Sequence, residues 1–349
     1  MKRRKGFVLI TSAISLIGLL IVVGLAVDVG RLYVAQGELQ VFTDEAAVAA
    51  AFELDGTTAG LTRARSAAAA GPGAGVSPNR WNFASQPVAG VTVEFAATPA
   101  GPYDSNPASA AGLRFVKVQA GGSIPLYFLP LLPSISASQN AAATAVAGQT
   151  RQQSLGNGLA PFSPTAHLNA DANYGFTPGT MYTLRWAPGG QRGSGGTCPG
   201  DSGFDPGSTS ERGYVDVGQG SGSSALRVAV INNSFFLPAP LTVGGTLQMY
   251  TGQESVPDAM EQRYAQDTDV TSTRFADYSG NGRRLLSVAV NGGGEPATVL
   301  GFASFFLHPT PCGTKNTTPC CAEYVGAAVV NSNHRGAGDS GLYAVQLVQ

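Results

Sequence analysis

The hydrophobic pattern of this chain begins with one long apolar run. Residues 7–27 (FVLITSAISLIGLLIVVGLAV) carry no charge, whereas residues 2–5 are all cations and residue 28 is an aspartate. As a helix, such a run spans about 30 Å, the thickness of the hydrocarbon core of a bilayer. Cations are retained on the cytoplasmic side of a membrane. The pattern therefore predicts a cytoplasmic basic cap at residues 1–6, a transmembrane helix at residues 7–27 and an extracytoplasmic remainder.

A cleaved secretory signal is the alternative for this segment. Secretory signals typically have an apolar region of about 7 to 15 residues followed by a small-x-small cleavage site. The run in this chain is longer, and no good site of that kind follows it. We therefore expect a signal-anchor that stays attached to the protein.

The helical pattern continues beyond the apolar run. Two rows of residues recur every seven positions, one of Leu25, Leu32, Leu39 and Ala46 and the other of Val29, Gln36, Thr43 and Ala50. They form a narrow apolar seam, which predicts a single helix over residues 7–54, about 72 Å long. We expect the seam to pack against a partner helix or against the chain's own sheet. Gly56 is placed to end the helix.

The pattern changes after this helix. Residues 61–70 (LTRARSAAAA) favour a short second helix, and alternating residues predict strands at 91–98 and 113–120. The segments 123–130 and 141–148 are candidates for a third and a fourth strand. The polar segment 149–157 favours a boundary, so residues 28–150 are expected to form one helix-plus-sheet domain.

Residues 151–349 show mainly strand patterns separated by turns rich in Gly and Ser. Candidate strands lie at 182–186, 214–217, 226–231, 246–250, 285–290, 299–308, 324–330 and 343–348, and one segment, 255–266, favours a helix. Many short strands with such turns are typical of a sandwich or barrel-like domain. The expected fold class is therefore α+β, with a transmembrane helix that continues into a helix-plus-sheet domain, followed by a β-rich domain.

The composition fits an extracytoplasmic location. Charged residues make up 12% of the chain, which also contains 46 Gly and 22 Pro, and ordinary soluble domains carry about 25% charged residues. The formal net charge is −1, and removing the four cations of the cap leaves −5 (−1 minus 4) for the remainder. A negative extracytoplasmic part argues against nucleic acid as a partner.

The four cysteines lie in the second half of the chain: Cys198, Cys312, Cys320 and Cys321. In an oxidising compartment they predict up to two disulfides, for which three pairings exist. A bond from Cys312 to Cys320 or Cys321 would close a short loop and leave the other cysteine for Cys198. A zinc site is disfavoured because no paired C-x-x-C spacing is present.

Around the membrane boundary, the order of the residues is a more specific signal than the hydropathy of the segment. The residues concerned are Gly6, Ala26, Val27, Asp28, Gly30, Arg31, Leu32, Tyr33, Leu39, Gln40, Asp44, Ala46, Ala47, Ala49 and Ala50. Their order resembles the N-terminal region of Tad/Flp pilus-assembly proteins of the TadE/TadG-like group. The helix-then-sheet order of residues 28–150 is also similar to TadG-like proteins, which implies a pilin-like fold for this domain.

The resemblance implies a single-pass protein of the bacterial inner membrane that acts as a component or assembly factor of a Tad/Flp-type pilus or secretion system. The expected partners are the membrane, other pilus-assembly or pseudopilin proteins, and a second copy through the N-terminal helix. Neither a cofactor nor a catalytic residue is expected. A surface adhesin or ligand-binding module is the alternative, followed by an envelope hydrolase.

Processing by a prepilin peptidase is a further question that the resemblance raises. Pilin-like precursors are cut after a glycine, and a glutamate stands five residues into the mature chain. A cut after Gly6 would place Thr11 at that position. The missing glutamate argues against cleavage and favours an assembly role over that of a fibre subunit.

Two short motifs could carry chemistry in the β-rich half. Gly-Asp-Ser-Gly occurs at 200–203 and 338–341, as around the nucleophile of chymotrypsin-like proteases, but the three histidines lack the sequence context of that family. Asp277, Ser279 and Asn281 match the first oxygen positions of a calcium loop, with Asp267 and Asp269 as further carboxylates. The twelfth position is Val288 rather than glutamate, so an ordinary turn is favoured over a calcium site.

Overall fold

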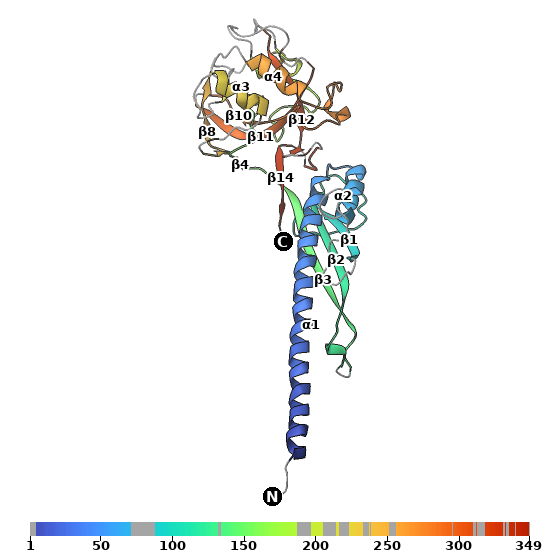
Figure 1. Cartoon of the computed structure of the whole chain (residues 1–349). Helices are drawn as coiled ribbons and strands as arrows, with labels where there is room; N and C mark the ends of the chain where they lie inside the picture. Colours follow the sequence, from blue (N-terminus) through green and yellow to red (C-terminus); the bar gives the residue numbers. More distant parts are fainter. Residues whose placement is uncertain are drawn as a thin grey trace.

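The computed structural model has a long helix, a sheet beside the second half of that helix, and a β-rich region beyond the sheet (Figure 1). The structure describes residues 5–70, 88–131, 134–186, 197–204, 214–215, 223–232, 237, 239–250, 256–294, 296–309, 312, 318–330, 332, 335–338 and 340–348. Most of the basic cap therefore lies outside the described residues.

The N-terminal helix α1, Lys5–Phe52, is continuous over 48 residues. Side chains in its apolar first half are exposed, such as Leu9 at 74% and Leu19 at 61%. Within the described part of the chain, α1 is the one helix that is long and apolar enough to cross a membrane. The prediction of a single helix over residues 7–54 is confirmed. After the helix, Gly56 adopts a φ of +79°, a conformation that glycine allows at low cost.

The second half of α1 packs on a five-stranded sheet in the order β1-β2-β3-β14-β13. The strands are β1 Ala89–Ala96, β2 Phe115–Pro125, β3 Ser138–Arg151, β13 Ala328–Val329 and β14 Leu342–Leu347. The short helix α2, Thr58–Ala70, packs against α1 and β1. Small residues make the contact, because Ala46 and Ala50 of α1 are fully buried in one cluster with Val116 and Ala145 of the sheet.

The apolar segment 123–130 does not form a separate strand, so the expectation of a third strand there is wrong. β2 continues through this region to Pro125 and pairs with β3 along its whole length. Gly121 and Gly122, which could have formed a turn, lie inside this ladder opposite Ala142 and Ala141. The chain then forms a short 3-10 helix, η1 Leu129–Leu131, before it returns as β3.

The sheet beside α1 is completed by residues from far along the chain. β14 pairs antiparallel with β3, Tyr343 opposite Arg151, and β13 pairs parallel with β14. The chain enters β13 directly after β12, at Gly326, whose φ of +87° lets the backbone turn from one sheet to the other. The division of the chain at residue 150 stays a prediction, since the first sheet draws strands from both sides of that position.

The β-rich region is built on a second sheet in the order β10-β11-β12-β5, with β8 paired to β11. Its strands are β5 Met181–Arg185, β8 Thr246–Leu247, β10 Leu285–Asn291, β11 Ala297–Leu307 and β12 Cys320–Gly326. Two short pairs, β4 Ser154–Leu155 with β7 Leu241–Thr242 and β6 Tyr214–Val215 with β9 Met249–Tyr250, lie beside it. The core is aromatic, with the rings of Phe176, Phe305 and Tyr324 in mutual contact. The α+β fold class is confirmed.

Residues 226–231 form a helix and not the expected strand. α3, Ser223–Asn232, buries Leu226 and Val230, which are one helical turn apart, and exposes Val228. It packs against α4, Val256–Ala265, where a helix was expected. Arg263 of α4 donates a 3.1 Å hydrogen bond to the carbonyl of Val230. Since the last carbonyls of a helix lack partners of their own, this contact stabilises α3.

Two of the expected strands divide into shorter ones. Residues 246–250 form β8 and β9, which pair with different partners, and residues 324–330 are divided between β12 and β13. Only residues 214–215 of the candidate strand 214–217 lie within the described part. The remaining strand predictions of the second half agree with the structure to within a few residues.

The four cysteines form two disulfides, Cys198–Cys321 and Cys312–Cys320. The first joins the loop after β5 to β12, across 123 residues of sequence. The second closes a loop of 8 residues before β12. Both bonds therefore stabilise the same edge of the second sheet.

Candidate functional site

Asp28 directly follows the apolar run, and its side chain is fully buried. Its carboxylate accepts three hydrogen bonds from the backbone N–H groups of Tyr127, Phe128 and Leu129, at 3.0, 2.9 and 2.7 Å. These groups lie at the start of η1, where the first N–H groups of a helix have no partner of their own. Asp28 therefore caps a turn that is about 100 residues away in sequence.

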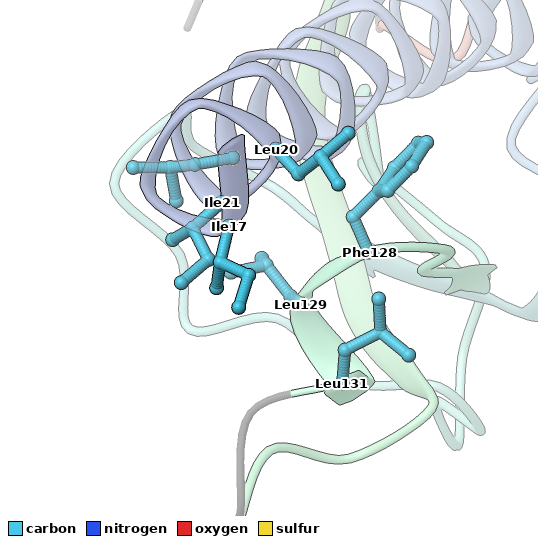
Figure 2. Close-up of a pocket in the computed structure, with 7 residues that line it drawn as sticks. Ile17, Leu20, Ile21, Phe128, Leu129 and Leu131 are labelled. Atoms are coloured by element: carbon cyan, nitrogen blue, oxygen red, sulfur yellow. The ribbon is translucent and has the colours of Figure 1, made fainter. Parts of the chain in front are cut away.

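The segment held by Asp28 is the loop between β2 and β3. It runs back along the apolar half of α1, as the lower part of Figure 1 shows. The loop and the helix form an apolar groove, with Ile17, Leu20, Ile21 and Leu25 on the helix and Phe128, Leu129 and Leu131 on the loop. Figure 2 shows the labelled side chains of the helix on one side and those of the loop on the other.

Gly24 allows the close approach of the loop to α1. A Cβ atom at this position would overlap the side chain of Phe128, including its own Cβ atom. At Gly18, one and a half turns earlier, a Cβ atom would meet nothing within 4 Å. At Gly24 the contact is made by the chain's own loop.

Two glutamine side chains hold α1 to β3, and the second of them, Gln40, belongs to the motif. Gln36 donates a 2.7 Å hydrogen bond to the carbonyl of Ala142. Gln40 donates to the carboxylate of Asp44 at 2.7 Å and to the carbonyl of Thr144 at 3.3 Å. The Gln–Asp pair of the motif therefore lies on the face of the helix that is turned to the sheet.

From Leu32 onward, the seam of α1 is covered by the chain's own sheet, whereas its first members, Leu25 and Val29, are exposed by 47 and 50%. Leu39 is buried in a cluster with Ile124 and Ala143, and Leu32 packs at the edge of the same cluster. Ala46 and Ala47 are buried about two turns beyond Leu39. Of the two expected partners of the seam, the structure contains the intramolecular one.

The far end of α1 is held by Gln149 of β3, whose side chain is fully buried. Its amide nitrogen donates to the carbonyls of Ala51 at 2.9 Å and Leu54 at 2.7 Å. Its amide oxygen accepts a 2.9 Å hydrogen bond from the N–H of Ala337. Gln149 therefore joins the helix end, the sheet and the segment before β14. Apart from the polarity of Gln149, no feature of the sequence indicates this role.

The opposite face of α1 is left open in the described residues. Val29, Tyr33, Val34 and Val41 are exposed by 50, 81, 43 and 53%. At Gly30, a motif residue on this face, a Cβ atom would meet nothing within 4 Å. Arg31 instead points to the loop, with its guanidinium 4.3 Å from the centre of the Tyr127 ring. Gly6 lies in the first turn of α1.

The β-rich region contains two pairs of histidine and carboxylate. His167 lies 2.7 Å from Asp201, whose other oxygen accepts the N–H of Thr183, and His308 lies 2.9 Å from Glu323. Ser340 donates its hydroxyl to the carbonyl of Ala172. In the portion of the chain that the structure describes, neither Ser202 nor Ser340 hydrogen-bonds a histidine. His334 and Asp339 lie outside it.

The candidate calcium residues form a turn that is held by protein hydrogen bonds. Asp277 ends the 3-10 helix η4, Phe275–Asp277, while the N–H of Ser279 donates to Asp269 and the Asn281 amide donates to the carbonyl of Gln266. Asp267 accepts from Tyr278 and from the N–H of Arg284. Among the described residues, no group of three or more His, Cys, Asp or Glu side chains could hold a metal ion. The structure adds no argument for a calcium site at this turn, and the site stays a prediction.

Comparison with protein families gives one match. Residues 6–53 match the family described as "Putative Flp pilus-assembly TadE/G-like". The matched segment is α1 almost residue for residue, and it includes the buried Asp28 and the helix face that packs on the sheet. No curated protein and no solved structure matches the chain. The resemblance of the N-terminal region to TadE/TadG-like proteins is therefore confirmed, and with the apolar helix it indicates a Tad-related membrane protein.

Proposed function

We propose that this chain is a membrane-anchored component of the machinery that assembles a Tad/Flp-type pilus or a related secretion system, and that it acts through protein contacts. The observation that carries the proposal is the coincidence of the family match with α1. The matched residues are those that attach the helix to its sheet and loop. The motif residues therefore belong to one structural unit, which consists of the anchor helix and the sheet and loop that it packs against.

The orientation proposed is that of a single-pass inner-membrane protein with its N-terminus in the cytoplasm. Support comes from the cations at residues 2–5 on one side of the apolar run and the sheet and β-rich region on the other. The two disulfides fit an oxidising compartment for the β-rich region. An alkaline phosphatase fused after residue 349 should be active, and a cytoplasmic reporter at the same place should not.

A role without catalysis agrees with the polar groups of the β-rich region. The described serines of the two Gly-Asp-Ser-Gly strings make no hydrogen bond to a histidine, which a nucleophile of that class requires. The buried carboxylates Asp267 and Asp269 accept hydrogen bonds from their own turn. The proposed task of this region is therefore to present a surface to partners.

The proposed contact to other assembly proteins is the open face of α1. It carries Val29, Tyr33, Val34 and Val41 and continues the apolar surface of the anchor beyond the membrane. A partner helix with the same kind of apolar continuation would cover it, as apolar helix surfaces are covered in helical assemblies. The seam on the other side is already covered by the sheet.

Deletion of the gene tests the proposal. We expect the amount of surface pilus to fall in the deletion strain and to return with the full-length chain. A photo-crosslinking residue at Tyr33 should give adducts with pilus-assembly proteins, whereas the same residue at Thr62, which is exposed on α2, should not. Normal piliation of the deletion strain would contradict the proposal.

A further inference from the structure

The loop between β2 and β3 exposes large apolar side chains. Tyr127 is exposed by 58%, Phe128 by 39%, Leu131 by 79% and Ile135 by 39%. No described element of the chain covers them. Contact of these apolar side chains with water is unfavourable. Together they therefore mark a surface that is in contact with an apolar medium other than water.

The position of the loop shows which phase this is. Phe128, Leu129 and Leu131 lie against Ile17–Leu25 of α1, the second half of the apolar run. Ile17 is 11 residues before Asp28, which corresponds to about 16 Å along a helix. An anchor that crosses the bilayer with Asp28 at the outer interface therefore brings the loop to a depth well inside the hydrocarbon core.

We propose that this loop is a second membrane-inserted element, and that acyl chains of the outer leaflet of the inner membrane occupy the groove between it and α1. The inference rests on the proposed anchoring in the membrane. It adds that the chain enters the bilayer twice, once with a helix and once with the tip of a β-hairpin. Lipid, rather than a protein partner, is the occupant of the groove.

The charge pattern supports insertion. Between Lys117 and Arg151 the sequence contains no charged residue, so the lower halves of β2 and β3 and the whole loop are uncharged. A charge in the hydrocarbon core costs several kcal/mol, and its absence over this length removes that penalty. Tyr127, which lies next to Arg31 at the level of Asp28, has the place and the amphipathic character of an interfacial aromatic residue.

The backbone of the first part of the loop, residues 126–131, has hydrogen-bond partners that suit a medium without water. Lipid offers no hydrogen bonds, so each backbone N–H needs a partner within the protein. The N–H groups of residues 127–129 donate to Asp28, that of Leu126 donates to the carbonyl of Ala137, and that of Leu131 donates to the carbonyl of Phe128. The prolines at positions 125 and 130 have no N–H at all. The buried carboxylate of Asp28 therefore accepts hydrogen bonds from three backbone N–H groups that would find no acceptor in lipid.

Tryptophan quenching by brominated lipids tests the inference. The full-length chain with both native tryptophans replaced by phenylalanine is reconstituted into phosphatidylcholine vesicles brominated on the acyl chains. Leu131→Trp is the probe, and its side chain is exposed enough for the change to leave the packing intact. Leu16→Trp reports on the anchor, and Leu168→Trp, which is exposed in the β-rich region, is the control outside the membrane.

We expect Leu131→Trp to lose emission to the same extent as Leu16→Trp, and Leu168→Trp to keep it. Quenching of Leu16→Trp without quenching of Leu131→Trp would overturn the inference and leave the anchor in place. Iodide would then distinguish a loop in water from a loop covered by another protein, and either result contradicts insertion into lipid. If Leu16→Trp is not quenched, the proposed anchoring fails together with the inference.

Discussion

The side-chain amide of Gln149 donates a hydrogen bond to the carbonyl of Leu54, just past the end of α1. The same side-chain amide also donates to the carbonyl of Ala51 and accepts from the N–H of Ala337, so all three of its hydrogen bonds are made to backbone groups. One fully buried side chain thereby supplies the partners that the end of a long helix lacks.

Replacing this residue should weaken the whole sheet unit. Gln149→Leu removes the side-chain hydrogen bonds to the carbonyls of Ala51 and Leu54 and to the N–H of Ala337, and a buried group left without a partner costs about 1–3 kcal/mol. We expect the free energy of unfolding in detergent to fall by several times the change seen for Gln139→Leu, an exposed position of the same strand. Equal effects of the two substitutions would contradict the role given to Gln149.

Asp28 should control the order of the loop between β2 and β3. Asp28→Ala removes three hydrogen bonds, and hydrogen bonds to a charged group contribute about 1.5–3 kcal/mol each. Hydrogen exchange measured by mass spectrometry should show faster exchange at residues 127–129, while the β2–β3 ladder stays protected. Glu45→Ala, at an exposed position of the same helix, is the matched control and should leave exchange unchanged. Unchanged protection in Asp28→Ala would rule out the capping role.

The two glycines of the anchor should respond differently to alanine. Gly18→Ala should be neutral or stabilising, because its Cβ meets open space and alanine favours a helix over glycine by about 1 kcal/mol. Gly24→Ala should displace the loop, because its Cβ would overlap Phe128. Hydrogen exchange at residues 127–129, measured by mass spectrometry, reports the effect of both substitutions. Adding Phe128→Gly to Gly24→Ala removes the overlapping side chain, including its Cβ atom, and should restore protection at residues 127 and 129. Failure of this rescue would contradict the contact.

The two disulfides should differ in their contribution to stability. The bond Cys198–Cys321 closes a segment of 123 residues and Cys312–Cys320 one of 8. Loop entropy then predicts contributions of about 5 and 2.5 kcal/mol. The paired variants Cys198→Ser with Cys321→Ser, and Cys312→Ser with Cys320→Ser, should therefore lower the thermal unfolding temperature of the β-rich region by clearly different amounts. The reverse order would show that strain or residual structure outweighs loop length.

Asp269 should make the β-rich region sensitive to acid. Hydrogen bonds from the hydroxyl of Ser272 and from the N–H groups of Ser272 and Ser279 hold the pKa of Asp269 well below its usual range. Since the pKa is lower in the folded state, the stabilisation is complete above the unfolded value of about 3.9 and is lost as the pH falls below it. Unfolding curves of the wild type and Asp269→Asn should differ at neutral pH and converge in acid. A difference that is the same at every pH would contradict this assignment.

The features that depend on local sequence could be predicted. The length of α1 follows from an uncharged run and a seven-residue repeat, both of which can be seen in neighbouring residues. The family motif was found in the same way, because its residues lie within one helix. Most strands of the β-rich region also have a clear alternation of side chains.

The features that depend on distant contacts could not be predicted. Leu226–Ile231 alternates like a strand, yet Leu226 and Val230 also share a helical face, and packing against α4 decides between the two. The partners of Asp28 lie 99 to 101 residues away, so the sequence showed only an acid beside a membrane anchor. The pairing of β14 with β3 connects residues that are more than 190 positions apart and left no local signal.

That pairing of β14 with β3 places the β-rich region as an insertion between two strands of one sheet. During synthesis, β3 is complete long before its neighbour β14, and the edge of β3 stays unpaired until residues 342–347 have been made. Closing so long a segment is slow compared with local pairing. A chain stalled or truncated within the β-rich region would therefore expose the unpaired edge of β3, a surface on which other chains can pair and aggregate.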